Sequence, residues 1–314
     1  MGEIRIGISG WRYAPWRGPF YPEGLRQADE LAFASAHFRS IEINGTFYSL
    51  QRPEYFAAWA RETPPEFVFA VKGPRFITHI RRLKDVEAPL ANFLASGVLE
   101  LGPKLGPILW QFPPSFRFDP ARMEQFFRLL PHDTEAAKSI AGRHDAKVAG
   151  RASIPDGPRR PLRHAVEIRH ESFAVPQFID LLRAGDVALV CADTVEWPRL
   201  MDVTSDFVYC RLHGSEVLYA SGYDDPALDE WTERVVAWAA GGEPADAERV
   251  AAPPPPRPEG RDVFIYFDND AKVRAPVDAQ GLQRRVSERL APAPAVAGVG
   301  FRPRPDAGTA RAER

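Results

Sequence analysis

Eight short apolar runs divide this chain, and each of them ends in or beside a polar residue. The runs and their polar ends are Ile4–Ile8 with Ser9, Ile41–Ile43 with Asn44, Phe67–Val71 with Lys72, Ile108–Trp110 with Gln111, Ala165–Ile168 with Arg169, Ala188–Ala192 with Asp193, Phe207–Cys210 with Arg211, and Val263–Phe267 with Asp268. Strands that are buried on both faces of a sheet read as continuous apolar runs. We therefore expect eight buried strands with polar groups at their carboxyl ends.

Segments with helical spacing of apolar residues lie between the runs: Ala28–His37, Pro53–Arg61, Asp85–Ser96, Asp119–Leu130, Pro176–Arg183 and Pro226–Ala239. A strand–helix unit repeated eight times is typical of a (β/α)8 barrel, so the sequence predicts an α/β fold of the TIM-barrel type in a single domain over residues 1–290. A doubly wound open sheet would need a glycine-rich phosphate turn after its first strand. Gly7–Trp11 does not have that pattern.

The spacing of the runs is uneven, and this predicts where the chain departs from a minimal barrel. Residues 133–163 form a long, charged segment between the fourth and fifth units, which we interpret as an insertion with some helix. Residues 241–260 contain four consecutive prolines and indicate an exposed loop. The short sixth unit predicts a short or irregular helix there. Residues 291–314 are rich in Ala, Pro, Arg and Gly, which predicts a disordered tail.

Composition and the first residues indicate the cellular compartment in which this protein is expected. A net charge of −2 gives the chain no global attraction to nucleic acid or to anionic membranes. The two cysteines, Cys191 and Cys210, lie inside apolar runs without zinc-binding spacing, as expected for structural residues in a reducing compartment. The chain begins on a strand without a signal peptide, and no apolar stretch approaches the ~20 residues of a membrane span. We therefore expect a cytoplasmic protein without membrane contact.

Strand alternation assigns the polar residues to faces, because successive side chains of a strand point to opposite sides. Charges facing the helices would be buried without water, so we expect them to point inward near one mouth of the barrel. This places together the acids Glu42, Glu167, Asp193, Asp268 and Asp270, the cations Lys72, Arg169 and Arg211, and the imidazoles His170 and His213. A satisfied ion-pair network that merely closes the barrel is the alternative interpretation. Buried ion pairs stabilise proteins weakly, so the size of the set favours a functional site.

The residue types indicate roles. Arg169 and Arg211 can hold a phosphate or carboxylate through paired N–H donors, and Lys72 can hold an anion or act as a base when burial lowers its pKa. Glu167 and Asp193 with His213 are the acid–base candidates. The remaining candidates for substrate contact are Trp11, Glu42, Asn44, Tyr48, Gln111, His170, Asp268 and Asn269.

A divalent metal is a second option for the mouth. Glu167, Asp193, His213 and Asp268 lie on successive strands, and carboxylates with histidine can hold Mg²⁺, Mn²⁺ or Zn²⁺. Three cations in the same mouth would repel such an ion. We therefore predict no metal and no other cofactor.

Aromatic residues interleaved with arginine crowd the loop after the first strand, from Trp11 to Tyr21. Such a segment can stack on bases while its cations hold phosphates, or it can pack the loop against the barrel. The sequence leaves these two interpretations open.

Several motifs in a fixed order resemble the YecE-like family, whose TIM-barrel domain is of unknown function (number 72 in its series). The resemblance extends from Gly7 to about Leu290 and depends on Gly7–Trp11, Trp16, Phe20–Pro22, Ile41–Tyr48, Phe67–Lys72, Ile77–His79, Leu105–Gly106, Gln111–Pro114, Ala165–His170, Tyr209–Gly214 and Tyr266–Asp270. It implies a TIM barrel and supplies no established reaction. Nucleic-acid binding has been suggested only by analogy with barrel endonucleases.

The leading hypothesis is an enzyme that acts on an anionic, phosphate-bearing substrate at the carboxyl ends of the strands. Phosphodiester hydrolysis there would require a metal. One alternative is a non-catalytic nucleic-acid-binding protein that uses the aromatic segment from Trp11 to Tyr21. A second alternative is a metal-free sugar-phosphate lyase or isomerase with Lys72 as a Schiff-base lysine. The sequence does not indicate an oligomeric state.

Overall fold

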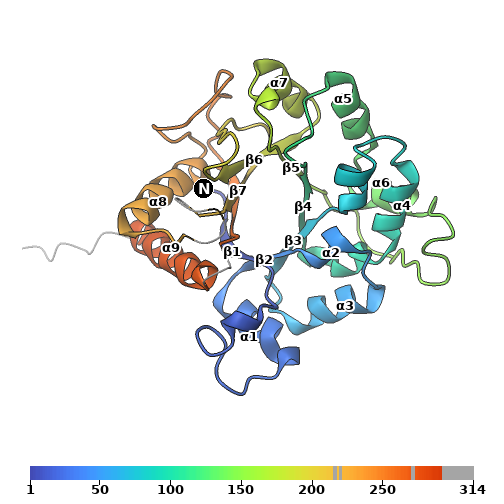
Figure 1. Cartoon of the computed structure of the whole chain (residues 1–314), viewed down its shortest axis with the longest axis horizontal. Helices are drawn as coiled ribbons and strands as arrows, with labels where there is room; N and C mark the ends of the chain where they lie inside the picture. Colours follow the sequence, from blue (N-terminus) through green and yellow to red (C-terminus); the bar gives the residue numbers. More distant parts are fainter. Residues whose placement is uncertain (215–217, 219–220, 270–272, 292–314) are drawn as a thin grey trace, which may run out of the picture.

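A computed structural model describes residues 1–214, 218, 221–269 and 273–291. Within these residues, eight parallel strands follow one another around a closed barrel (Figure 1). The strands are β1 (Ile4–Ser9), β2 (Ser40–Ile43), β3 (Val68–Lys72), β4 (Leu105–Gln111), β5 (His164–Glu167), β6 (Val187–Asp193), β7 (Phe207–Leu212) and β8 (Asp262–Phe267). Pairing of Ile4 with Val263 through Ile8 with Phe267 closes the barrel between its first and last strands. The predicted (β/α)8 fold is confirmed.

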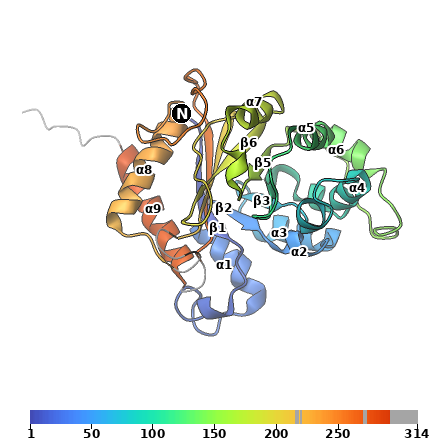
Figure 2. The ribbon, with the colours of Figure 1, turned by 45° about the horizontal axis from the view of Figure 1, so that its top comes forward.

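Helices surround the barrel on its outside (Figure 2). They are α1 (Glu30–His37), α2 (Gly45–Tyr48), α3 (Pro53–Glu62), α4 (Glu87–Ala95), α5 (Pro120–Leu129), α6 (Thr134–Ala141), α7 (Pro176–Ala184), α8 (Asp225–Ala239) and α9 (Arg274–Leu290). Six of them coincide with the segments expected from helical spacing. Helix α9, which lies beside α8, was not expected. Its buried residues Ala275, Ala279, Leu282 and Val286 follow helical spacing, so the signal was present in the sequence.

The irregular segments behave largely as their composition predicts. Helix α6 occupies the start of the 133–163 segment and packs against α4, and the rest of that segment forms no further helix. Residues 194–206 contain no helix, which agrees with the short sixth unit, and residues 241–260 contain neither helix nor strand. The expected tail falls almost entirely on residues 292–314, which lie outside the described part of the chain. No helix among the described residues is long and apolar enough to cross a membrane.

Two apolar clusters separate the inside of the barrel from the layer between strands and helices. The inner cluster includes Ala70, Leu109, Ala165, Ala188, Val190, Ala192, Phe207, Tyr209, Phe264 and Tyr266. The outer cluster holds the intervening residues of the same strands together with the apolar faces of the helices. The inner cluster therefore fixes, strand by strand, which residues near the carboxyl ends point into the barrel mouth.

Candidate active site

At the carboxyl ends of seven strands, polar side chains point to the inside of the barrel and line its mouth. On β3, β4, β5, β7 and β8 each of these residues lies two or four positions after a member of the inner cluster, and so shares its face. On β1 and β2, Ser9 pairs with Glu42, and Glu42 accepts a hydrogen bond from the inner-cluster residue Tyr209. The inward set is Ser9, Glu42, Asn44, Lys72, Gln111, Glu167, Arg169, Arg211, His213 and Asp268. Nine of these ten residues were predicted, and alternation along the strands was sufficient to group them.

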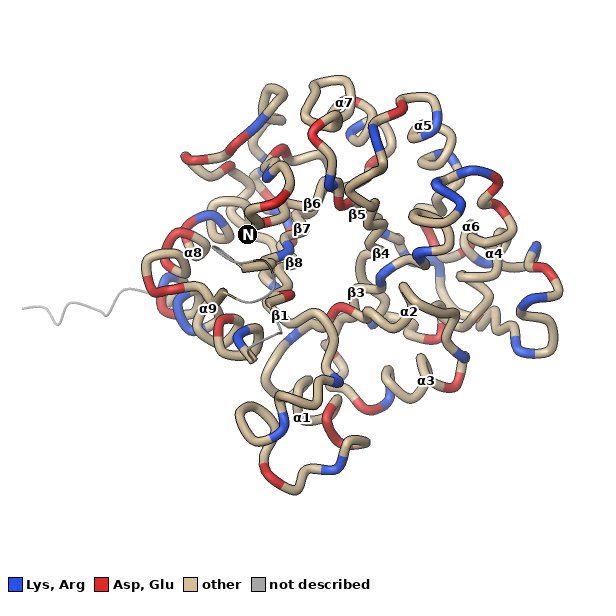
Figure 3. The backbone as a smooth tube through the Cα atoms, in the orientation of Figure 1, with Lys and Arg blue, Asp and Glu red and all other residues tan. Residues whose placement is uncertain are grey.

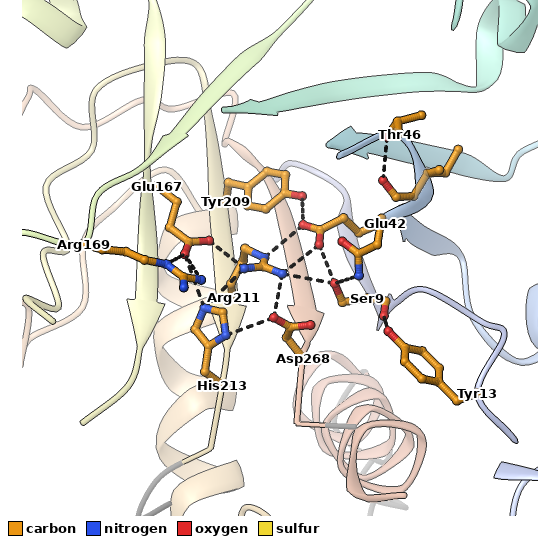
Figure 4. A network of polar contacts seen from close by, with 12 residues as sticks. Ser9, Tyr13, Glu42, Thr46, Glu167, Arg169, Tyr209, Arg211, His213 and Asp268 are labelled. Atoms are coloured by element: carbon orange, nitrogen blue, oxygen red, sulfur yellow. Dashed lines mark hydrogen bonds and ion pairs between the residues drawn. The ribbon is translucent and has the colours of Figure 1, made fainter. Parts of the chain in front are cut away.

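Arg211 lies at the centre of the mouth and is fully buried (Figure 4). Its Nε and Nη2 donate to the two carboxylate oxygens of Glu42, at 3.1 and 2.9 Å. Its Nη1 lies 2.7 Å from Oε2 of Glu167, and its Nη2 lies 2.7 Å from Oδ2 of Asp268. We call Arg211, Glu42, Glu167 and Asp268 the Arg211 cluster. Because three carboxylates occupy its donors, Arg211 is not available to a substrate anion, contrary to the sequence-based expectation.

Two hydroxyl groups complete the hydrogen bonding of Glu42. Ser9 Oγ donates to Glu42 Oε1, and Tyr209 donates its phenolic proton to Oε2 at 2.6 Å. Ser9 Oγ in turn accepts from Asn44 Nδ2 at 2.9 Å and from Arg211 Nη2 at 3.2 Å. Ser9 was missed in the sequence, although it ends the first apolar run and shares the inward face.

The charges of the cluster decide how its acids titrate. Burial alone would raise the pKa of Glu167, but Arg169 and Arg211 outweigh burial and hold this pKa far below its usual range. Burial is likewise outweighed at Asp268, where Arg211 and His213 hold the pKa well below the ordinary value. Both carboxylates are therefore ionised at neutral pH. They act as fixed negative charges and not as proton donors.

His213 is a buried imidazole of the mouth that lies between Arg211 and Asp268. Its Nδ1 lies 3.1 Å from Asp268 Oδ2, and its Nε2 lies 3.4 Å from Arg211 Nη1. Because Arg211 can only donate, Nε2 is the acceptor and the imidazole proton faces Asp268. Burial, followed by the charge of Arg211, lowers the pKa of His213. This arrangement suits a proton-transfer role for His213.

Lys72 differs from the other cations of the mouth because its amine has no acid partner. The side chain is 8% exposed, and Nζ lies 4.5 Å from the ring centre of Phe47. Among the described residues, no carboxylate lies within ion-pair distance of this amine and no hydrogen bond reaches it. Burial, and then the charge of Arg211, lowers the pKa of Lys72 to about 8.

Two further basic residues gather around the ring of Phe47. The Arg75 guanidinium lies 5.9 Å from the ring centre, and the His79 imidazole meets the ring edge-on at 5.1 Å. Burial, and then the charges of Arg75, Arg169 and Lys72, lower the pKa of His79 to about 4. His79 is therefore neutral at pH 7, and we call Lys72 and Arg75 the Phe47 cationic group. It provides positive charge that the Arg211 cluster does not neutralise.

Arg169 pairs with an acid of the Arg211 cluster, and its charge also acts on His79. Its Nε donates to Glu167 Oε1 at 2.7 Å, and its guanidinium stacks 4.0 Å from the ring centre of Trp197. The indole of Trp197 also meets His213 edge-on at 5.4 Å. Trp197 was not among the predicted site residues, but its position shortly after the sixth strand places it over the mouth.

Three predicted residues lie away from the mouth. Asp193 follows the inward-facing Ala192, so its side chain takes the outer face, where Arg199 binds it at 2.9 Å. Asn269 follows the inward Asp268 and donates to Asp278 on α9 at 2.8 Å. Trp11 packs edge-on against Trp59 of α3 at 5.3 Å and also contacts Phe69.

Two other predicted residues lie at the edge of the mouth. His170 accepts the Ser172 backbone N–H through Nδ1 at 3.0 Å, which caps the short turn Glu171–Phe173. Tyr48 is 70% exposed and lies edge-on to Phe47. Asp270, which was also expected in the mouth, lies outside the described residues.

The donor set does not resemble a metal site. Asp193 faces the outer layer with Arg199 and does not join the other three expected ligands. Glu167, His213 and Asp268 gather around Arg211, whose guanidinium occupies the position between them and binds both carboxylates. Across the described ranges, no group of three or more His, Cys, Asp or Glu side chains is placed to hold a metal ion. The expectation that no cofactor is needed stays a prediction.

The fold and its mouth define a (β/α)8-barrel protein with a mixed-charge site at the carboxyl ends of the strands. Residues 5–298 match the family described as "Protein of unknown function DUF72", and the chain belongs to this family. The predicted relationship to YecE-like proteins is thereby confirmed.

Curated relatives and solved structures agree with this assignment. The chain is 30% identical to the UPF0759 protein YecE of Escherichia coli K12 over 113 residues, which are 36% of this chain and 39% of YecE. It is also 30% identical to the UPF0759 protein YunF of Bacillus subtilis, over 36% of this chain and 41% of YunF. The matches thus span about two fifths of these relatives.

A crystal structure of a DUF72 family protein from Thermotoga maritima superimposes with a TM-score of 0.66 at 23% identity, over 91% of this chain and 99% of that one. One from Enterococcus faecalis gives a TM-score of 0.63 at 16% identity, over 90% and 95%. These likenesses establish the fold alone.

Proposed function

We propose that this protein is an enzyme that binds a small anionic substrate at the barrel mouth and uses Lys72 as its reacting amine. The observation that carries this proposal is the buried Lys72 ammonium without a carboxylate partner in the described part of the chain. An unpaired buried charge costs several kcal/mol, about 3–5 kcal/mol in proteins where one partner of a pair has been removed. A substrate anion would supply the missing partner.

Of the three cations that the sequence favoured for anion binding, Lys72 is the one without a carboxylate partner among the described residues. Arg211 is occupied by three acids and Arg169 is paired with Glu167, so the cations of this region without a carboxylate partner among the described residues are Lys72 and Arg75. Arg169 adds positive charge at the mouth while its guanidinium stacks on Trp197. A phosphate or carboxylate beside Lys72 would meet a cation that pairs with no described carboxylate, in a region where the charges of Arg75 and Arg169 also act.

The chemistry that this mouth supports best is metal-free. The carboxylates are occupied by arginine, so a phosphodiesterase that depends on them for a metal is disfavoured. A lysine whose pKa is about 8 is partly neutral near physiological pH, as proton transfer or attack on a carbonyl group requires. His213, held by Asp268, is the second proton-transfer group. These features favour a lyase or isomerase of an anionic carbonyl compound.

Nucleic-acid binding was suggested by the aromatic segment from Trp11 to Tyr21, and most of its rings are buried. Trp16 and Tyr21 are fully buried and Trp11 is 6% exposed, so these rings pack the loop and are not free to stack on bases. Along the helices, Lys and Arg are mixed with Asp and Glu rather than gathered into a basic stripe (Figure 3). We therefore favour a small molecule over nucleic acid as the binding partner.

Binding of a simple anion tests the proposal. Titration calorimetry at pH 7 with glycerol 3-phosphate should show binding to the wild-type protein, and Lys72→Met should weaken it by about 10- to 100-fold, because a charge-assisted contact is lost. Binding should also weaken as the pH rises through about 8, where Lys72 loses its charge. Lys84→Met, which changes an exposed lysine, is the matched control. No binding, or equal binding by Lys72→Met, would contradict the proposal.

A further inference from the structure

We infer that the anionic substrate carries hydroxyl groups, which donate hydrogen bonds to the amide oxygens of Asn44 and Gln111. This inference rests on the proposed function and specifies its substrate class. The two amides lie at the ends of β2 and β4, which are the neighbours of β3 on either side. Lys72 ends β3, so the two amides flank the reacting amine.

The Asn44 oxygen lacks a partner for a reason fixed by its neighbours. Ser9 Oγ gives its proton to Glu42, so toward Asn44 it can only accept. The Asn44 Nδ2 therefore faces Ser9, at 2.9 Å, and the orientation of the amide is set. The Oδ1 atom is left buried with no hydrogen bond among the described residues. This oxygen is an acceptor that the protein itself does not use.

Gln111 repeats the arrangement on the other side of Lys72. Its strand pairs Gln111 with the mouth residue Glu167, which confirms that the side chain shares the inward face. The residue is 5% exposed, and its Oε1 is buried without a hydrogen-bond partner in the part of the chain that the structure describes. A buried acceptor without a donor costs stability comparable to a lost hydrogen bond. Two such oxygens beside one amine therefore indicate donors supplied from outside.

The surrounding charges decide which donors fit. A ligand ammonium group would supply N–H donors, but Lys72 and Arg169 would repel it. A carboxylate, or the phosphate dianion that dominates at pH 7, has only acceptors and would leave both amide oxygens unsatisfied. Hydroxyl groups donate without adding positive charge, so they satisfy the amides and tolerate the cations. The site thus points to a small hydroxylated phosphate or carboxylate, in the chemical class of sugar phosphates and sugar acids.

A matched pair of ligands tests this inference. Glycerol 3-phosphate and n-propyl phosphate carry the same charge and differ by two hydroxyl groups. Calorimetry at pH 7 should show that the wild-type protein binds glycerol 3-phosphate about tenfold more tightly. Gln111→Met keeps the length of the side chain but removes the amide, so it should reduce this preference to about threefold or less. The quantity compared is the ratio of the two affinities within each variant. Gln125→Met, on the exposed face of α5, should behave as wild type.

The outcomes separate the two proposals. Equal binding of both phosphates to the wild-type protein would overturn the inference and mean that water satisfies the amide oxygens, while the anion site would stand. Failure of both to bind would remove the proposed function itself. An unchanged preference in Gln111→Met would exclude that amide as the hydroxyl acceptor. If Gln111→Met does not fold, the wild-type comparison alone still decides the substrate class.

Discussion

The two ends of the barrel both carry buried or half-buried charges, but they pair them differently. At the amino ends of the strands, Arg163 binds Asp206 and Asp262, each at 2.7 Å, and Arg5 pairs with Glu3. At the carboxyl ends, Arg211 binds three carboxylates while Lys72 has no acid partner among the described residues.

This difference separates structural from functional charges. In TIM barrels, active sites lie at the carboxyl ends of the strands, whereas the other end contributes to stability. The Arg163 side chain is 30% exposed, and both acids that it contacts are bound by its guanidinium. The opposite end keeps a buried cation and two buried amide oxygens unsatisfied, an arrangement that stability alone does not favour.

The largest effect is expected when Arg211, the central arginine of the carboxyl end, is removed, and removal of Arg163 at the amino end is its comparison. Arg211→Met leaves three carboxylates without their shared counter-charge in a fully buried position, so the free energy of unfolding should fall by about 3–5 kcal/mol or more. Arg163→Met removes partly exposed pairs and should cost only about 1 kcal/mol. Urea denaturation at pH 7 measures both values. Equal losses would show that the ends do not differ as described.

The next largest effect is expected at Lys72, where a substitution should increase the free energy of unfolding instead of lowering it. Its folded-state pKa of about 8 lies below the ordinary 10.5, so the charged form is disfavoured in the folded protein. Lys72→Met should therefore raise the free energy of unfolding at pH 7 by about 3 kcal/mol. Between pH 8 and 10.5 the unfolded chain holds more protons at Lys72, so wild-type stability rises with pH and the advantage of Lys72→Met shrinks.

Lys104 provides the matched control for that measurement. It is equally buried, but its amine donates to the carbonyl oxygens of Ala60 and Thr63, each at 2.6 Å. Lys104→Met should therefore destabilise the protein. Urea denaturation of both variants at pH 7 and pH 10 makes the comparison. Destabilisation by Lys72→Met at pH 7 would mean that this amine contributes to the structure after all.

The smallest effect is expected at Asp193. Its carboxylate faces the outer layer and binds Arg199, so Asp193→Asn should leave the affinity for glycerol 3-phosphate within about twofold and cost about 1 kcal/mol of stability. Calorimetry and urea denaturation measure the two quantities. A loss of affinity as large as that of Lys72→Met would show that Asp193 contributes to ligand binding.

Alternation along the strands predicted most of the site, and its failures have identifiable causes. Glu42, Arg211 and Asp268 lie on strands whose inward faces could be extended to a charged end, so their grouping could be predicted. The run before Asp193 is apolar on both faces, so the sequence could not tell which face its carboxylate takes. A shift of one residue moves a side chain to the opposite face. For Asn269 the signal existed, because its neighbour Asp268 already occupied the inward face.

The sequence could not predict which charges pair. Arg211 was as plausible an anion ligand as Arg169, because both are inward arginines at strand ends. Only the three-dimensional arrangement shows that carboxylates from three different strands converge on Arg211. The packing of Trp11 and Tyr21 under their loop was equally invisible, since aromatic residues serve both packing and stacking.

The Arg211 cluster also connects parts of the chain that a ribosome makes at very different times. Glu42 precedes Arg211 by 169 residues, and Asp268 follows it by 57. The last carboxylate arrives with the strand that also closes the barrel against β1. A nascent chain that ends before β8 therefore lacks both its final strand pairing and one counter-charge of its central arginine. Such long-range contacts slow folding, and here they couple closure of the barrel to completion of the polypeptide.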